Sequence, residues 1–209
     1  MVSDAVMTFA MKAAEEIGVP EVQFWTASAC GLMGYCQYKE LVRRGIIPFK
    51  DDNDFTNGYL DTPLEWIPGS KGLMRLRDMP AFCRTTNPDD TMVHFMIEQI
   101  SNCTKSSGII VNTLQELEQD IIHGLEKIFP KIYAIGPLNL LVEDMPNEDR
   151  VELDSTMWTE DSDTLAWLDS KTPGSVIYIN FGSVGVMTED QMTEFAWGSR
   201  QAASNSSGC

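Results

Sequence analysis

The sequence predicts an α/β protein built on a parallel β-sheet. Short runs rich in β-branched residues alternate along the chain with segments of helical periodicity. Helix-start and helix-stop signals punctuate this alternation. One apolar run, residues 175–183, also passes directly into a turn of small residues, which is typical of a buried strand next to a ligand. We therefore expect parallel strands joined by helical crossovers, with helices on both faces of the sheet.

Composition and charge limit the possible partners. The chain has 209 residues, of which 43% are hydrophobic, and a formal net charge of −16. An acidic chain offers no basic surface to a nucleic-acid backbone, so we expect no nucleic-acid partner. No apolar run approaches the ~20 residues that span a bilayer, and no basic-then-apolar leader begins the chain. We expect no integral membrane segment and a cytoplasmic location.

The five cysteines support the same location. Their number is odd, their spacing is wide, and no CxxC pair indicates a zinc site. A disulfide framework is therefore not expected, and a reducing compartment fits best.

The first part of the chain predicts a helix, a strand and a second helix. Apolar residues at helical spacing predict that the first helix follows residues 1–4 at once: Val6, Ala10, Ala13 and Ile17. Gly18 ends this helix, and residues 22–25 read as a strand. Ser28 can cap the second helix, which ends near residues 43–45.

No period holds from residue 50 to residue 86, and the segment mixes acidic residues with Trp, Met, Gly and Pro. A long irregular segment in a compact domain is usually functional or disordered, and this one is rich in aromatic and Met side chains. We interpret it as the wall of a pocket.

The middle of the chain repeats the alternation. Asn87-Pro88 predicts a helix start, followed by a buried stripe of Met92, Phe95, Met96 and Ile100. Residues 108–112 predict the next strand. A capping box at residues 113–116 predicts a helix with an apolar face of Leu114, Leu117, Ile121 and Leu125, and residues 132–135 predict a further strand.

The last part predicts a second domain that this chain begins but does not complete. Residues 139–160 are polar and acidic, as in a linker. A short helix at residues 164–168, the strand at 175–183 and a helix from Thr188 follow, and beyond residue 198 the apolar content falls. One strand with two helices cannot bury itself.

Six short segments are specific in their order and spacing: Val2–Asp4, Gly18–Thr26, Leu76–Pro80, Thr85–Asp90, Ile135–Leu138 and Tyr178–Ser183. With these segments the sequence resembles plant family-1 UDP-dependent glycosyltransferases, in particular the subgroup that glucosylates small alcohols such as iridoid, terpenoid and cyanohydrin aglycones. The likeness runs from residue 1 to about residue 198. It implies the GT-B fold, in which two Rossmann-like domains face each other across a cleft.

The resemblance implies a domain plan. Residues 1–138 are expected to be part of the N-terminal acceptor-binding domain and residues 139–160 the interdomain linker. Residues 161–198 are expected to begin the C-terminal UDP-sugar-binding domain, and residues 199–209 are a divergent tail. The implied co-substrate is UDP-glucose, with a small hydroxylated molecule as acceptor, no further cofactor and no metal.

The resemblance also implies roles for four residues. Asp4 matches the acid that orients and charges a catalytic histidine, although an Asp at a helix N-terminus is a common structural feature. Thr26 matches a position that contacts the donor sugar, although a Thr at a strand end also bonds backbone groups. Ser183 matches a residue that reaches the donor phosphates, and Gly182 lets the backbone come close.

Two departures from the family pattern limit the expected activity. The family's histidine base lies upstream of the matching segments, and neither His94 nor His123 lies in a matching motif. The long donor-binding signature of the second domain is also missing. We therefore expect this chain alone to be weakly active or inactive.

Two other readings of the sequence stay open. One is a non-catalytic, truncated remnant that binds a partner through an unfinished sheet edge. The other is a nicotinamide-dependent dehydrogenase, which the absence of GxGxxG after a strand disfavours.

Overall fold

The computed structural model describes residues 1–143, 145–146, 162–182 and 187–206. By its internal contacts the chain divides into two compact units, Met1–Val151 and Glu152–Cys209, which we call unit 1 and unit 2. Within the described ranges, none of the helices combines the length and the hydropathy of a segment that crosses a membrane.

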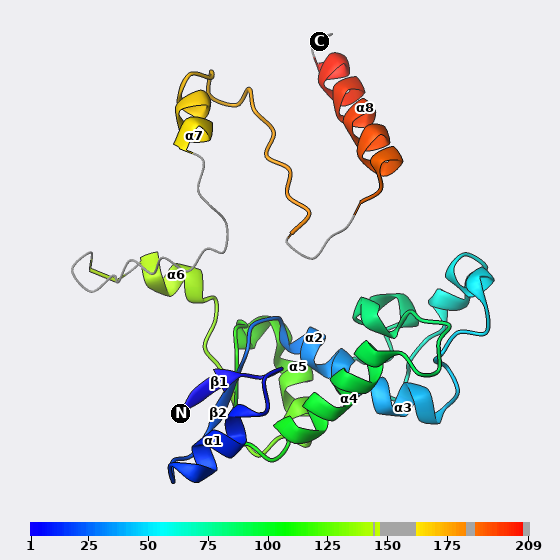
Figure 1. Cartoon of the computed structure of the whole chain (residues 1–209), viewed down its shortest axis with the longest axis vertical. Coiled ribbons are helices and arrows are strands. Elements are labelled where there is room, and N and C mark those ends of the chain that lie inside the picture. The colour runs from blue at the N-terminus through cyan, green and yellow to red at the C-terminus, as the bar shows by residue number, and fades with distance from the viewer. Residues whose placement is uncertain (144, 147–161, 183–186, 207–209) are drawn as a thin grey trace. The chain divides into compact units, whose positions relative to one another are not determined.

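Unit 1 is built on a parallel sheet, which confirms the predicted α/β class (Figure 1). The sheet has four strands in the order β1-β2-β3-β4, and every neighbouring pair is parallel. The strands are β1 (Val2–Asp4), β2 (Val22–Trp25), β3 (Ile109–Val111) and β4 (Ile132–Ala134). All four carboxyl ends therefore lie at one edge of the sheet, where ligands bind in open α/β folds.

Helices occupy the connections between the strands: α1 (Ala10–Glu16), α2 (Ala29–Cys36), α3 (Tyr38–Arg43), α4 (Thr91–Cys103) and α5 (Gln115–Leu125), with α6 (Leu138–Glu143) after β4. Helix α2 contacts both α4 and α5, and the three lie together beside the strands (Figure 1).

The prediction of helices on both faces of the sheet is wrong for the described residues. On one face the strand side chains are buried, including Gln23, Trp25, Ile109 and Val111. The residues between them, on the other face, are only partly buried or exposed: Val2, Val22, Phe24, Ile110 and Tyr133. The cause is the strand order, because right-handed crossovers that always advance in one direction place their helices on the same face.

The chain begins with a strand, which the sequence did not predict. Residues 2–4 form β1 and pair with residues 22–24 of β2, and the first helix begins only at Ala10. Asp4 therefore lies at the end of a strand and not at a helix N-terminus. A three-residue edge strand has too few residues to display the alternation that reveals longer strands.

Side-chain caps fix the starts of two helices. Ser28 caps α2 as predicted, because its Oγ accepts a hydrogen bond from Gly31 N at 3.0 Å. Helix α4 is capped by Asp90, whose Oδ1 accepts from Met92 N and Val93 N at 2.9 and 3.1 Å. The predicted start at Asn87 is therefore three residues too early.

The prediction for the apolar face of α5 is half right. Ile121 and Leu125 are buried, but Leu114 and Leu117 are exposed. The capping box at residues 113–116 does not form, since Leu114 is the N-cap and has no side-chain cap hydrogen bond. The Thr113 hydroxyl donates instead to Glu118.

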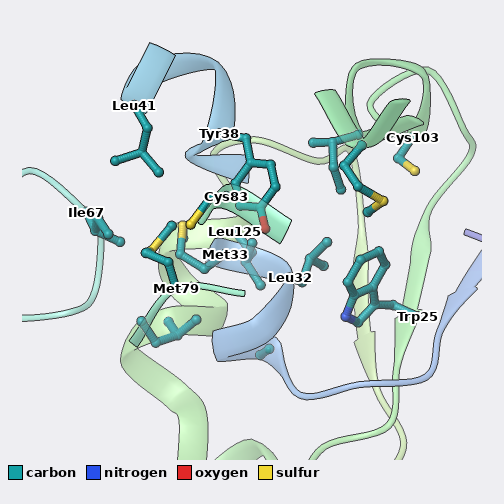
Figure 2. Close-up of a cluster of buried hydrophobic side chains, with 14 of the residues drawn as sticks. Trp25, Leu32, Met33, Tyr38, Leu41, Ile67, Met79, Cys83, Cys103 and Leu125 are labelled. Carbon is teal, nitrogen blue, oxygen red and sulfur yellow. The ribbon is translucent and has the colours of Figure 1, made fainter. Parts of the chain in front are cut away.

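The irregular segment at residues 50–86 forms much of the core, and only Phe82 from it lines the pocket at Asp4. It contains the short 3-10 helices Asp52–Phe55, Tyr59–Asp61, Leu76–Asp78 and Ala81–Cys83. Figure 2 shows Met79 and Cys83 of this segment beside Met33 and Tyr38. The Tyr38 hydroxyl donates to the Pro80 carbonyl at 2.7 Å, which ties the segment to α3.

Unit 2 contains α7 (Ser162–Asp169) and α8 (Glu189–Ser206), joined by chain of which residues 170–182 and 187–188 are described. The predicted strand at 175–183 is wrong over its described part, because residues 175–182 are not in a strand. Ser183 lies outside the described residues. A strand needs a hydrogen-bonded neighbour, and β-propensity alone does not supply one.

The division between the units falls within residues 139–160, where the sequence predicts a linker. Helix α6 occupies part of that range, and residues 144 and 147–160 lie outside the described residues. The exact domain boundaries stay predictions.

Candidate functional site

Two of the four predicted site residues line one pocket at the carboxyl edge of the sheet. Asp4 is the last residue of β1, and Thr26 directly follows β2. The register pairs Asp4 with Phe24, so Thr26 lies two residues beyond Asp4's partner. The pocket has a volume of about 290 Å³.

The walls of this pocket are mostly apolar. The lining residues are Asp4, Val6, Phe24, Trp25, Thr26, Ala27, Tyr35, Phe82, Met92, Phe95 and Met96. The Trp25 and Tyr35 rings meet edge to face with centroids 5.4 Å apart, which fixes one wall. An apolar pocket with few polar groups is typical of a site for a small organic molecule.

Part of this lining was not predicted from the sequence. Met92 and Phe95 were assigned to the buried stripe of α4 because they lie at helical spacing. Both are partly exposed, whereas Val93, Met96 and Ile100 form the buried face. Tertiary packing decides which face of α4 is buried, and apolar periodicity alone does not reveal it.

The Asp4 carboxylate is fixed on one side and open on the other. Its Oδ1 accepts a hydrogen bond from Val6 N at 2.8 Å, and the residue is exposed. Among the described residues no other group donates a hydrogen bond to this carboxylate. Asp4 lines the pocket, so its Oδ2 can accept a hydrogen bond from a donor that binds there. An imidazole N–H is such a donor.

The loop of residues 26–28, between β2 and α2, is held by the start of α2. Thr26 is exposed, and its hydroxyl has no hydrogen-bond partner among the described residues. Two residues later Ser28 caps α2, and the carboxylate of Glu118 on α5 accepts from Ala29 N and Cys30 N, both at 2.8 Å. The first turn of α2 is therefore tied to α5, which fixes where the loop leaves β2.

Glu118 reaches this position because α5 is kinked there. Its φ and ψ are −116° and 22°, which are not helical. Partial burial raises the pKa of the Glu118 carboxyl, but hydrogen bonds from Cys30, Thr113 and Ala29 outweigh this and leave the pKa lower than usual. No local sequence pattern indicates this role of Glu118, because its partners are 88 and 89 positions away.

Gly182 and Ser183 are the residues predicted to meet the donor phosphates, and Gly182 is not among the residues that line the pocket. Gly182 belongs to unit 2 and has a left-handed backbone with φ +75°, and its N–H donates to Asn180 Oδ1 at 2.6 Å. Ser183 lies outside the described residues. The donor contacts of both residues stay predictions.

The two histidines of the chain lie elsewhere. His94 is exposed on α4, with its Nε2 3.0 Å from the Pro88 carbonyl oxygen, and His123 is exposed on α5. Neither lines the pocket that holds Asp4.

Comparison with known proteins shows what the chain is similar to. No protein-family model matches the chain. The sequence is 51% identical over 200 residues to (R)-mandelonitrile beta-glucosyltransferase of Prunus dulcis, and 52% identical over 198 residues to 7-deoxyloganetin glucosyltransferase of Gardenia jasminoides. Each alignment covers 95% of this chain and 41% of the relative, so the chain spans about two fifths of the length of these proteins.

Solved structures agree. Medicago truncatula UGT71G1, solved in complex with UDP-glucose, is 29% identical with a TM-score of 0.64, over 97% of this chain and 41% of that protein. A glycosyltransferase of Siraitia grosvenorii, solved with UDP, has a TM-score of 0.65 at 24% identity, over 97% of this chain and 43% of that one, and shows the shared GT-B fold alone. Over nearly its whole length the chain is therefore similar to plant UDP-glycosyltransferases, of which it spans about two fifths.

Proposed function

We propose that this chain is the acceptor-binding part, with the beginning of the donor-binding part, of an enzyme that transfers glucose from UDP-glucose to a hydroxyl group of a small plant metabolite. The observation that carries the proposal is the pocket at the carboxyl edge of the sheet. It places Asp4 and Thr26 on one largely apolar cavity, in a chain about half identical to two plant glucosyltransferases.

The chemistry that fits the pocket is an inverting displacement. A histidine of the complete enzyme removes the proton of the acceptor hydroxyl, and the oxygen attacks the anomeric carbon as UDP leaves. The proton then rests on the imidazole, which becomes cationic. The open Oδ2 of Asp4 accepts from the far N–H of that imidazole and stabilises its charge.

Thr26 and the residues of unit 2 act on the donor. The exposed hydroxyl of Thr26 donates to a sugar hydroxyl, and the loop tied to Glu118 keeps it in place. Gly182 and Ser183 meet the diphosphate of UDP. The reaction needs no metal and no further cofactor, because UDP itself is the leaving group, and we place the enzyme in the cytoplasm.

The acceptor is a small and mainly apolar alcohol. A cavity of about 290 Å³ lies at the lower end of the volumes usual for small-molecule sites. The relatives named above are glucosyltransferases of mandelonitrile and 7-deoxyloganetin, which are small molecules of the same kind.

A chimera tests the proposal. Residues 1–198 replace the matching stretch of the complete Prunus dulcis relative, and UDP release is measured with a panel of small alcohols. We expect turnover that Asp4→Asn lowers by about 10²–10⁴-fold, the usual effect of disabling acid–base catalysis. Thr26→Val, which keeps the shape and removes the hydroxyl, raises KM for UDP-glucose or lowers kcat.

The matched control is Asp51→Asn. Asp51 is also exposed, and its Oδ1 accepts from the backbone N–H two residues on, Asn53 N at 2.9 Å, but it does not line the pocket. We expect parent-like turnover from this variant. A folded chimera that binds UDP-glucose but transfers glucose to none of the alcohols would refute the proposed function.

The 209-residue chain alone is expected to show little or no transfer, because it contains neither the family's histidine motif nor its long donor signature. Turnover of UDP-glucose at a rate similar to that of the complete relative would contradict this.

A further inference from the structure

The turn that follows Asp4 determines where its carboxylate lies. Val6 N donates to Asp4 Oδ1 at 2.8 Å, and Met7 N donates to the Asp4 carbonyl oxygen at 3.0 Å. Both the side chain and the backbone of Asp4 are therefore bonded to residues 5–8, which we call the Asp4 turn. A shift of this turn would move the carboxylate relative to the pocket that Asp4 lines.

The far end of the Asp4 turn is bound to α4 by buried hydrogen bonds. Gln99 Oε1 accepts from Thr8 N at 3.2 Å and from the Thr8 hydroxyl at 2.7 Å. Thr8 Oγ1 also accepts from Asn102 Nδ2 at 3.3 Å. Thr8 is 7% exposed and Gln99 is 8% exposed, so loss of the Gln99 oxygen would leave two buried donors without their acceptor.

The near end of the turn is held by the sheet and by the same helix. Ala5 N donates to the Phe24 carbonyl oxygen at 3.1 Å, and Cys103 Sγ donates to the Ala5 carbonyl oxygen at 3.0 Å. Burial raises the pKa of the Cys103 thiol to about 12, so the thiol keeps its proton at neutral pH and can donate. A thiol is a weak donor, so the two bonds to Gln99 are the stronger link to α4.

Helix α4 also forms a wall of the pocket. Met92, Phe95 and Met96 line the pocket together with Asp4. Gln99 follows Met96 by three residues and therefore lies on the next turn of the helix. One rigid element thus contributes both a wall of the pocket and the support of the acid.

We propose that Gln99 is a positioning residue for Asp4: it holds Thr8, and thereby fixes the turn that orients the Asp4 carboxylate. Gln99 is not among the residues that line the pocket, so it acts through the turn and not on the acceptor. The inference rests on the proposed function, in which the Asp4 carboxylate stabilises the imidazolium of the complete enzyme.

Amide hydrogen exchange of the full 209-residue chain tests the structural step. Gln99→Met keeps the length of the side chain and removes the acceptor. We expect the amides of Thr8 and Val6 to exchange at least ~10-fold faster in this variant. Val6 is the informative amide, because its acceptor is Asp4 Oδ1 and not Gln99. Faster exchange at Thr8 alone would show that the loosening does not reach Asp4, and would overturn the proposal.

The matched control is Ser106→Ala. Ser106 is 6% exposed, and its hydroxyl donates to the Cys103 and Gly108 carbonyl oxygens at 2.8 and 3.1 Å, just beyond the end of α4. This variant also loses buried hydrogen bonds, but none to the Asp4 turn. We expect lower stability in urea and unchanged exchange at Val6. If the control accelerates Val6 as much as Gln99→Met does, the effect is general destabilisation and the proposal is wrong.

The chimera with the Prunus dulcis relative tests the catalytic step. Gln99→Met should lower kcat by about 10–100-fold, as a small misplacement of a catalytic group does, and leave the KM for the acceptor nearly unchanged. Thr8→Val should also lower kcat, whereas Thr8→Ser, which keeps the hydroxyl, should restore most of it. Ser106→Ala should turn over at the parent rate. A raised KM with an unchanged kcat would assign Gln99 to acceptor binding and overturn the proposal.

The double variant Asp4→Asn/Gln99→Met separates the two proposals. If Gln99 acts through Asp4, the double variant should be about as slow as Asp4→Asn alone, because no carboxylate is left to position. Losses that multiply would show an independent role of Gln99 and overturn the inference. If Gln99→Met alone leaves turnover unchanged, this inference fails and the proposed function stands. If Asp4→Asn leaves turnover unchanged, the proposed role of Asp4 fails, and this inference fails with it.

Discussion

Replacing Glu118 by alanine should loosen the start of α2. The Glu118 carboxylate accepts hydrogen bonds from Ala29 N and Cys30 N, each at 2.8 Å, and from the Thr113 hydroxyl. These two N–H groups belong to the first turn of α2, where no carbonyl of the helix can accept from them. Glu118 thus acts as an N-cap supplied by a different helix.

The expected cost follows from the contacts that are lost. A hydrogen bond to a charged group contributes about 1.5–3 kcal/mol, and the attraction between a carboxylate and a helix N-terminus about 0.3–1 kcal/mol. The contacts share one carboxylate and do not add fully, and water reaches part of this site. We therefore expect Glu118→Ala to cost about 2–4 kcal/mol locally. At about 1.4 kcal/mol for each factor of ten, this corresponds to roughly 30- to 700-fold.

Amide hydrogen exchange at Ala29 and Cys30 measures this effect, and urea unfolding followed by circular dichroism measures its share of global stability. The matched control is Glu116→Ala, which removes an exposed acid from the first turn of the same helix, α5. We expect the control to leave both amides unchanged. Equal exchange rates in the wild type and in Glu118→Ala would refute the capping role.

The pH dependence provides a second check on Glu118. Its pKa in the folded chain is lower than usual, so the ionised form is favoured by folding. The stabilisation is fully present above the unfolded glutamate pKa of about 4.3 and is lost as the pH falls through the lower folded value. The difference in stability between the wild type and Glu118→Gln should therefore shrink as the pH falls below about 4.3.

Two further predictions concern the space around two glycines and the reactivity of one cysteine thiol. A Cβ at Gly69 would approach the Asp120 carbonyl oxygen to a distance that no side chain tolerates, whereas Gly72 also has a positive φ but faces open space. Gly69→Ala should therefore lower the free energy of unfolding, measured by urea unfolding, by more than about 3 kcal/mol, and Gly72→Ala by only about 1–2 kcal/mol. Equal effects would contradict the clash. Partial burial and the Glu118 carboxylate raise the pKa of the Cys30 thiol to about 12, so iodoacetamide should modify Cys30 slowly at pH 8, and faster in Glu118→Gln. Rapid alkylation of the wild-type thiol would show that the pKa is not raised.

Local signals sufficed for elements whose determinants are adjacent in sequence. Residues 22–25 and 109–111 were recognised as strands because they are short apolar runs between turn signals. Ser28 was recognised as a cap because its partner, Gly31 N, is three residues away. In each case the hydrogen bonds or the burial pattern are encoded within a few positions.

Prediction failed where distant residues decide the outcome. The Thr113 hydroxyl was expected to cap its own helix, but Glu118 competes for it and is itself held by α2. Residues 175–182 have the composition of a strand, yet a strand forms only where a neighbour accepts its backbone groups. Neither outcome can be predicted from local sequence.

The candidate site likewise contains residues that were predicted and residues that were not. Asp4 and Thr26 were identified through the family resemblance, and the structure adds that they line one pocket. The walls contributed by Phe82, Met92 and Phe95 were not predicted as a set, because they come from two segments whose relative placement depends on tertiary packing. Apolar periodicity cannot separate a pocket wall from a core face.

The one-sided sheet has a thermodynamic consequence. Val2 and Tyr133 on its less buried face are 65% and 43% exposed in the folded chain. Unfolding hydrates little new apolar surface there, and the heat capacity of unfolding depends on that new surface. We expect a heat-capacity change below the roughly 12–15 cal/mol/K per residue of ordinary domains. The stability of unit 1 should therefore vary less with temperature than that of a sheet covered on both faces.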